Sequence, residues 1–417
     1  MLTLGYAEAD ITPNAPLELV GFNRKETVSK GILAPLLAQV SVWESEERCC
    51  LITIDSLGFI KELADALRMK VGNLLNISKD KVMLCFSHCH SAPNAATSAE
   101  YFEMVCKNIL SAADKAGRNL QPAGIGYMNA EVDIGVNRRT GNTNLDKRAG
   151  ILKVCDSEGK IKLLLVRITA HCNVLKGDNL FISPDFFGTI RDVLKKEYNC
   201  PVMVIQGSAG NIAPKYFDSA KTPADARGAE YIRSYTALQD MANAVSEKLA
   251  QGVATLANAE NVCLKMYSKE IVLRSPVPPT KRAEQIATEA KNTCGIDGAA
   301  WLKEIQKLHE LGIDFQEEKA EVQYFSIGDF LLCGVPYELM VEFALDVMEK
   351  TSNEFFYVNG YTNGCSSYFP TEEEYDLGGY EVYYSMLLYY KYHGRVFPFE
   401  RESANKLIEF MIENAKI

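Results

Sequence analysis

The chain has 417 residues, of which 47% are hydrophobic and 24% charged, so it is long enough and apolar enough to bury a sizeable core. A formal net charge of −10 without clusters of Lys and Arg argues against nucleic acid or an anionic membrane as a partner. No apolar run approaches the ~20 residues that span a bilayer, which predicts no stable membrane insertion.

The compartment is indicated by the first residues and by the cysteines. Residues 1–10 lack the basic and long apolar stretches of a secretion signal. The twelve cysteines are scattered without a C-x-x-C motif, which favours a reducing compartment over a disulfide framework. We therefore expect a cytoplasmic protein. Cysteines in strand-like apolar runs are expected to be buried, namely Cys49, Cys50, Cys85, Cys263 and Cys333.

Strand and helix patterns alternate along the whole chain. The first half predicts strands at 38–43, 49–54, 81–86, 124–134, 150–155, 161–170 and 201–205, and helices at 60–76, 98–117, 185–198 and 227–251. The second half predicts strands at 262–273, 321–326, 330–334 and 354–359, and helices at 280–311, 339–350 and 401–416.

This alternation has no repeats and no Pro- or Ser-rich linkers. We therefore expect residues 1–417 to form a single α/β domain, in which helices flank a mixed β-sheet core. The charged helical region near 276–318 is predicted to be an insertion, with the form of a hairpin broken at Gly295. It would serve as a lid or an edge.

Polar residues follow several of the expected strands at the point where each ends. They are Asp55, His88 with His90, His171, the Gly207–Gly210 loop and Glu338. Strand ends that meet at one rim are the usual site of α/β proteins. The Gly207–Gly210 loop lacks the Gly-Lys-[Ser/Thr] ending of a phosphate loop, so it is either a plain turn or an anion site made by backbone N–H groups.

His88 and His90 are two of only five histidines, and they are one residue apart. In a strand they would project to the same face. Such a pair can share a metal, divide into one ligand and one acid/base, or be a surface pair without function. His309 and His393 are expected to be surface or structural residues.

His88, His171 and Glu338 together would make a His₂Glu set, an open coordination shell suited to catalytic zinc. Zinc held in this way lowers the pKa of a bound water to about 7 and polarises a carbonyl oxygen. His90 would then be free to act as general base and acid.

A series of motifs resembles, in order, those of the neutral/alkaline non-lysosomal ceramidase family, from residue 10 to about residue 384. His88-Cys89-His90-Ser91-Ala92-Pro93 is similar to the family's H-x-H-S-x-P signature. The other matching segments are Asp10-Ile11-Thr12-Pro13, Asn137-Arg138, His171 with Ser183-Pro184-Asp185-Phe186-Phe187-Gly188, Pro336-Tyr337-Glu338, Tyr368-Phe369-Pro370-Thr371-Glu372-Glu373-Glu374-Tyr375 and Tyr380-Glu381.

The resemblance implies zinc-dependent hydrolysis of an N-acyl bond by an activated water. It implies that the zinc ligands are His88, His171, Glu338 and Tyr368. It also implies that His90, Arg138 and Tyr380 contact the scissile amide or its tetrahedral intermediate, with His90 as the proton shuttle.

The chain departs from the family in two respects. The family's Gly-Asp-Val-Ser-Pro stretch appears as Gly210-Asn211-Ile212-Ala213-Pro214, so Ala213 stands where the family has its serine. We also expect no C-terminal immunoglobulin-like domain and no secretion signal. We therefore expect a small-molecule amide or ester as substrate rather than a membrane ceramide.

Two alternatives stay open at this point. The first is a ceramidase-like protein that has lost the serine and binds a ligand or metal without turnover. The second is another metal hydrolase, but amidohydrolases need more histidines, and metallo-β-lactamase-like enzymes need an Asp-His soon after the H-x-H. The substrate, the physiological metal and the oligomeric state are not decided by the sequence.

Overall fold

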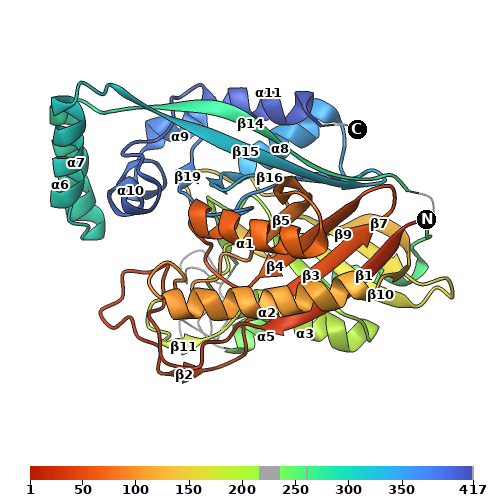
Figure 1. The fold of residues 1–417 in the computed structure, drawn as a ribbon. Coiled ribbons are helices and arrows are strands. Elements are labelled where there is room, and N and C mark those ends of the chain that lie inside the picture. Colours follow the sequence, from red (N-terminus) through yellow and green to blue (C-terminus); the bar gives the residue numbers. More distant parts are fainter. Residues whose placement is uncertain (216–234, 260–261, 416–417) are drawn as a thin grey trace.

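A computed structural model describes residues 1–215, 235–259 and 262–415 (Figure 1). Its longer strands are β1 (Thr3–Asp10), β3 (Leu37–Glu44), β4 (Arg48–Ile54), β5 (Val82–Phe86), β7 (Gly124–Glu131), β9 (Arg148–Cys155), β10 (Ile161–Ile168), β12 (Val202–Gln206), β14 (Leu264–Pro276), β15 (Phe315–Ile327), β16 (Phe330–Gly334) and β18 (Phe356–Asn359). Its short strands are β2 (Gly31–Ile32), β6 (Gln121–Pro122), β8 (Gly135–Asn137), β11 (Phe181–Ile182), β13 (Ile212–Pro214), β17 (Glu338–Leu339) and β19 (Tyr368–Phe369).

The helices are α1 (Lys61–Leu75), α2 (Ala99–Arg118), α3 (Asp185–Tyr198), α5 (Tyr235–Leu249), α6 (Thr280–Cys294), α7 (Ala299–Glu310), α8 (Val341–Thr351), α9 (Glu372–Leu377), α10 (Met386–His393) and α11 (Ser403–Glu413). A π-helical turn occupies Tyr380–Tyr384. Of the helix predicted at 227–251, residues 227–234 lie outside the described residues. No helix in the described ranges is both long and apolar enough to cross a membrane.

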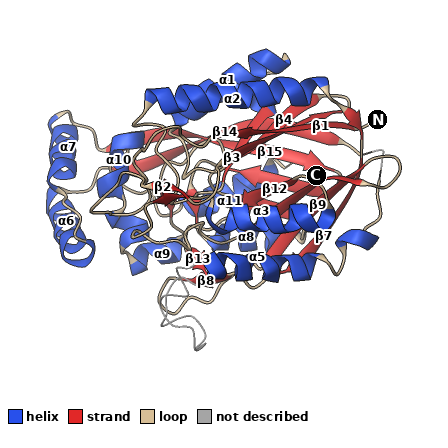
Figure 2. Cartoon of the chain, turned by 90° about the horizontal axis from the view of Figure 1, so that it is seen from below, coloured by secondary structure: helices blue, strands red, loops and turns tan. Residues whose placement is uncertain are grey.

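The strands form two stacked β layers. A five-stranded sheet, β5-β4-β3-β1-β6, and a four-stranded sheet, β12-β10-β9-β7, make up the first layer, where β12 contacts β4 and β5. A second four-stranded sheet, β14-β15-β16-β18, makes up the other. Helices α1, α2, α3 and α5 cover the first layer, and α8 and α11 cover the second (Figures 1 and 2). The mixed α/β fold predicted from the sequence is confirmed.

Alternation along the strands explains why the layers stack. In β10, Leu164 and Val166 face the helices, whereas Leu163 and Leu165 face the second β layer, and all four are fully buried. The opposing sheet contributes Phe325, Ile327 and Leu332 to the same core. Strands that are buried on both faces consist of continuous apolar residues, and the sequence has such runs in these segments.

Parallel strand pairs bring the candidate residues to one end of the molecule. β4 runs parallel to β5, β10 to β12, and β16 to β18. Backbone bonds join the two layers beyond these ends: the Phe86 N–H donates to the Tyr361 carbonyl, and the Gly210 N–H donates to the Leu339 carbonyl. Figure 2 shows loops crowded at the end of the strands that lies nearest α10.

The predicted helical insertion is a hairpin of α6 and α7 at the tip of the β14–β15 ribbon. The ribbon is longer than expected, pairing Leu264 with Ile327 at its base and Pro276 with Phe315 at its tip. The sequence missed residues 315–320 of β15 because most of them are polar and partly or fully exposed. The helical hairpin packs on the π-helical turn, where Ala283 and Ile286 join a cluster with Tyr384 and Leu387. The boundaries of a single domain stay a prediction.

A buried ion pair ties α1 to the second β layer and gives a stability prediction. Arg68, fully buried, donates to both carboxylate oxygens of Glu321, at 2.6 and 2.8 Å. Arg68→Ala leaves that carboxylate buried without its partner, so the free energy of unfolding should fall by about 3–5 kcal/mol in urea titrations. The control Arg118→Ala removes an exposed pair with Asp114 and should cost under about 1 kcal/mol. Equal losses in the two variants would contradict the assignment.

Candidate metal centre

Three histidines meet at the loop end of the strands. His88 and His90 follow β5, and His171 follows β10. One nitrogen from each of the three rings lies within 4.8 Å of the others, and at most 6% of any of these side chains is exposed. A buried histidine cluster of this size can hold a metal ion.

The backbone brings His88 and His90 together differently from the sequence prediction. Strand β5 ends at Phe86, and His88 lies in the left-handed region with φ of 58°. The two rings therefore do not share a strand face, yet their centroids are 4.9 Å apart. A positive φ is costly for a residue with a side chain and is held here by packing, since the Tyr361 ring stacks on His88 at 4.2 Å.

The same tautomer is set at all three rings. Each Nδ1 lies within hydrogen-bond distance of a backbone carbonyl, which can only accept a proton, so Nδ1 carries the hydrogen. The acceptors for His88, His90 and His171 are the carbonyls of Leu57, Gly21 and Ala209, at 2.8, 2.8 and 2.7 Å. Each Nε2 is left with a free lone pair. A hydrogen bond from Nδ1 to a backbone carbonyl is typical of histidines that bind a metal through Nε2.

Glu338 closes one side of the cluster. Its carboxylate oxygen Oε2 lies 3.1 Å from His88 Nε2 and 3.5 Å from His171 Nε2, and the side chain is fully buried. Neither carboxylate oxygen has a hydrogen-bond donor within the described part of the chain. Burying a charge without a partner is costly, so this carboxylate favours a cation beside it.

The charges within the cluster suit a bound cation. Burial and the nearby charge of Arg138 lower the pKa of His171 to about 4. Burial and the neighbouring His88 lower the pKa of His90 well below its ordinary value. The pKa of Glu338 is also held well below its ordinary range, because the imidazoles of His88 and His171 outweigh burial, which opposes ionisation. At neutral pH the imidazoles of His90 and His171 are therefore neutral and the Glu338 carboxylate is ionised.

The separations of the donor atoms test whether a zinc ion fits. Tetrahedral zinc with bonds of about 2.0–2.1 Å keeps its ligand atoms about 3.3 Å apart. The distances from the Glu338 oxygen to His88 and His171, 3.1 and 3.5 Å, lie on either side of that value. His90 makes no such close pair with Glu338. The residues present fit a metal held by His88, His171 and Glu338, with His90 beside it.

Two short parallel strands place Tyr368 next to Glu338. β17 pairs with β19 so that Glu338 and Tyr368 lie opposite each other. Arg138 donates to the Tyr368 hydroxyl at 2.9 Å and to the Gly210 carbonyl at 2.6 Å, and its Nε lies 2.9 Å from a Glu381 carboxylate oxygen. Burial raises the pKa of Tyr368 well above its ordinary value, and the Arg138 charge opposes that shift.

The remaining predicted residues lie around this group, with one exception. The Tyr380 ring contacts that of Tyr368 at 5.9 Å between centroids, and burial raises its pKa to about 12. Ala213 is fully buried in β13, opposite Val136 of β8. Asp55 does not join the rim, because its carboxylate pairs with Arg191 at 2.9 Å. His309 and His393 stand outside the cluster.

Sequence reasoning missed two segments of the site. The first is Gly21-Phe22-Asn23-Arg24, where Gly21 has a φ of +92° and a Cβ would lie 2.4 Å from His90 Nδ1. The second is Tyr361, whose ring covers His88. Neither has a local sequence signal that connects it to the histidines.

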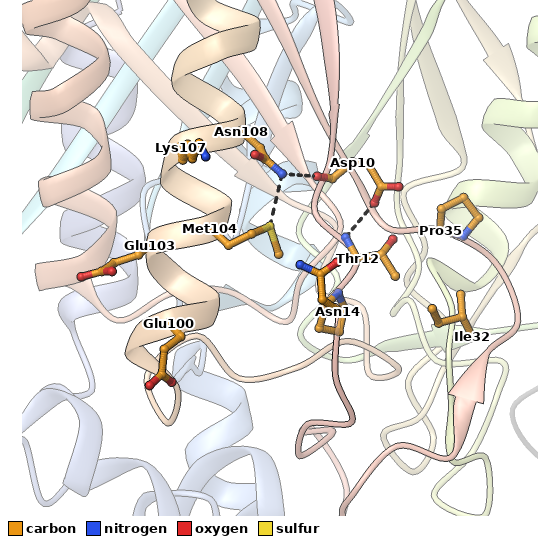
Figure 3. Close-up of a pocket in the computed structure, with 11 residues that line it drawn as sticks. Asp10, Thr12, Asn14, Ile32, Pro35, Glu100, Glu103, Met104, Lys107 and Asn108 are labelled. Carbon is orange, nitrogen blue, oxygen red and sulfur yellow. Dashed lines mark hydrogen bonds between the residues drawn. The ribbon is translucent and has the colours of Figure 1, made fainter.

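A hollow of about 920 Å³ lies elsewhere, between α2 and the segment that follows β1 (Figure 3). Its wall has mixed charge, including Asp10, Glu100, Glu103 and Lys107, and the Asn108 side chain donates to the Asp10 carbonyl at 2.8 Å. None of the candidate site residues lines it. It is separate from the histidine cluster.

Two solved structures share this architecture over almost the whole chain. The neutral ceramidase from Pseudomonas aeruginosa is 18% identical, with a TM-score of 0.72, and the match covers 99% of this chain and 73% of that one. The chain has the fold of a neutral ceramidase. A ceramidase solved in complex with C2 is 16% identical with a TM-score of 0.74, over 99% of this chain and 74% of its own. No protein-family model matches the sequence.

The hydrogen bonds of the three rings predict a specific proton arrangement. In metal-free protein at pH 7, ¹⁵N spectra should show the Nδ1–H tautomer for His88, His90 and His171, because their Nδ1 atoms face carbonyls. His309 is the internal control: its Nε2 lies 3.1 Å from the Pro278 carbonyl, so it should show the Nε2–H tautomer. A predominant Nε2–H tautomer at His88 or His171 would rule out the arrangement.

Proposed function

We propose that the protein is a zinc-dependent hydrolase of the neutral ceramidase-like type that cleaves an amide (N-acyl) bond. His88, His171, Glu338 and Tyr368 would hold the zinc. The observation that carries the proposal is the buried Glu338 carboxylate, which lies within 3.1 and 3.5 Å of two imidazole nitrogens and has no hydrogen-bond donor among the described residues. The fold shared with solved ceramidases supports it.

When bound, the zinc would supply a water of lowered pKa and polarise the substrate carbonyl. His90 would take the proton of that water at Nε2 and deliver it to the leaving nitrogen. Its Nε2 is buried and has no partner among the described residues, and its Nδ1 is fixed on the Gly21 carbonyl. The low pKa of His90 keeps the imidazole neutral and able to accept a proton.

Arg138 and Tyr380 would stabilise the oxyanion that forms when water adds to the amide carbonyl. Arg138 already donates to the Tyr368 hydroxyl, and it is held by Glu381, which also pairs with Arg139 at 2.8 Å. The positive charge of Arg138 favours a phenolate at Tyr368, the form in which that residue would bind a metal.

A small-molecule amide is the proposed substrate rather than a membrane ceramide. The support is Ala213, which has no hydroxyl where the ceramidase family has its serine. We also propose a cytoplasmic location. All twelve cysteines are free thiols, which agrees with a reducing compartment. The expectation that Cys263 is buried was wrong: it precedes β14 and is exposed.

A second candidate follows from the same residue. Ala213 is fully buried and has no hydroxyl. If catalysis by this fold needs that hydroxyl, the protein would bind a metal or ligand without turnover. The zinc–water route through His90 does not use it, and for this reason we favour the hydrolase.

The metal content of the purified protein tests the hydrolase proposal. Protein prepared without chelator should contain about one zinc ion per chain, because the donor set matches an open zinc shell. His88→Ala should lose the metal. His90→Ala should keep the metal and lose activity by roughly 10²–10⁴-fold, since it removes a general acid and base.

The outcomes are distinguishable. Zinc far below one ion per chain in the wild type would reject the metal centre. Zinc lost equally from His88→Ala and His90→Ala would show that His90 is a ligand and not the proton shuttle. His309→Ala, outside the cluster, should change neither zinc content nor activity.

Ala213→Ser separates the hydrolase from the binding protein. Wild type and variant would be screened on N-acyl amides, N-acyl amino acids and esters. We expect the wild type to hydrolyse at least one N-acyl amide, because the zinc–water route needs no serine. Activity that appears only in Ala213→Ser would favour the binding protein.

A further inference from the structure

Arg24 is a buried arginine that has no carboxylate partner in the part of the chain that the structure describes. Five arginines in the described part of the chain are buried, and Arg24 is 8% exposed. The other four each lie within 4.0 Å of a carboxylate: Arg68 with Glu321, Arg167 with Asp146, Arg191 with Asp55 and Arg395 with Glu318. Within the described residues no carboxylate comes this close to Arg24, which makes it the exception.

Arg24 lies directly beside the proposed proton shuttle. One terminal nitrogen donates to the His90 carbonyl at 2.8 Å, and the other donates to the Val20 carbonyl at 3.0 Å. The Nε atom is buried and has no hydrogen-bond partner among the described residues. The guanidinium therefore has N–H groups that make no hydrogen bond within the described residues and are available to a ligand.

The Phe22 ring lies between the two groups. Its centroid is 4.9 Å from the Arg24 guanidinium carbon and 4.8 Å from the His90 ring. Phe22 is partly exposed. Arg24, Phe22 and His90 thus form one wall beside the metal centre.

The backbone fixes this wall to the histidine loop. Leu19 bridges to Pro93, and the Val20 N–H donates to the Ala92 carbonyl at 3.4 Å. Gly21 accepts the His90 Nδ1 hydrogen, and its φ of +92° is open to glycine. The position of Arg24 relative to His90 is therefore set by several independent contacts.

The electrostatics favour an anion at this position. A guanidinium removed from water without a countercharge is costly, and a carboxylate supplies both the charge and a bidentate fit. Asp178 is the carboxylate whose charge acts on Arg24 from farther away, but it is exposed and therefore hydrated. A carboxylate ligand that enters the site would give Arg24 the countercharge that it lacks among the described residues.

We propose that Arg24 binds a carboxylate of the substrate, so that the substrates are N-acyl amino acids. This rests on the proposed hydrolase function. His90 must face the leaving nitrogen to protonate it, and Arg24 adjoins His90, so the carboxylate belongs to the amine half of the amide. Water adds its oxygen to the acyl carbon, the C–N bond breaks, and the nitrogen takes a proton. The products are a carboxylic acid and a free amino acid.

A matched pair of substrates tests the charge preference. N-hexanoylglycine and N-hexanoylglycinamide have nearly the same size and differ in the carboxylate. The wild type should prefer the acid in kcat/KM, and Arg24→Gln should reduce that preference by roughly 10- to 100-fold, mainly through KM, since a hydrogen bond to a charged group is lost. Arg118→Gln, an exposed arginine of α2, should keep the wild-type preference.

Arg24→Lys keeps the positive charge but loses the planar guanidinium that can bind a carboxylate through two hydrogen bonds. We therefore expect a preference for the acid between those of the wild type and Arg24→Gln. If circular dichroism shows that Arg24→Gln does not fold, Arg24→Lys tests the role of Arg24 in its place. A wild type that hydrolyses the two amides equally well would overturn the proposal. So would a preference for the acid that is the same in wild type, Arg24→Gln and Arg24→Lys.

Calorimetric titration separates this proposal from the hydrolase itself. Tighter binding of N-hexanoylglycine than of the glycinamide, weakened in Arg24→Gln, supports the carboxylate site even if neither compound is hydrolysed. Hydrolysis of the two compounds without any charge preference keeps the hydrolase and overturns the role of Arg24.

Discussion

The candidate site depends on one buried charge. Glu338 has no exposed surface and no hydrogen-bond donor within the described residues, yet the imidazoles beside it keep its pKa low. A carboxylate in that position is stable when a cation shares it. The Nδ1–carbonyl bonds of His88 and His171 serve the same end, because they leave the two Nε2 atoms facing the carboxylate rather than the backbone. Charge and orientation together suit this cluster to a metal ion.

The stacked β layers explain how residues so distant in sequence reach this charge. His88 and His171 leave strands of the first layer, whereas Glu338 follows β16 of the second. The layers are joined at this end by the bridge between Cys85 and Thr362, and by the Leu84 N–H, which donates to the Asn363 side chain. Both β layers are therefore needed to build the site. A chain with only one of them would lack either the histidines or Glu338.

Most strands and helices, and several residues of the candidate site, could be predicted from the sequence. The features that could not be predicted have physical causes. Apolar runs and helical stripes gave most elements within a few residues, since strands buried on both faces are unambiguous. Residues 315–320 of β15 were missed because a polar ribbon exposed to water has no apolar pattern. The meeting of His88 with His90 was expected from strand geometry, but the actual cause is a left-handed turn at His88. Arg24 could not be found at all, because its position comes from long-range contacts with the histidine loop.

Anomalous X-ray diffraction at the zinc absorption edge, on crystals of the zinc-loaded protein, tests the central claim most directly. We expect one strong peak about 2.0–2.1 Å from the Nε2 atoms of His88 and His171 and from a Glu338 oxygen, with His90 outside bonding distance. A peak bonded to His88, His90 and His171 together, or no peak between these residues, would contradict it.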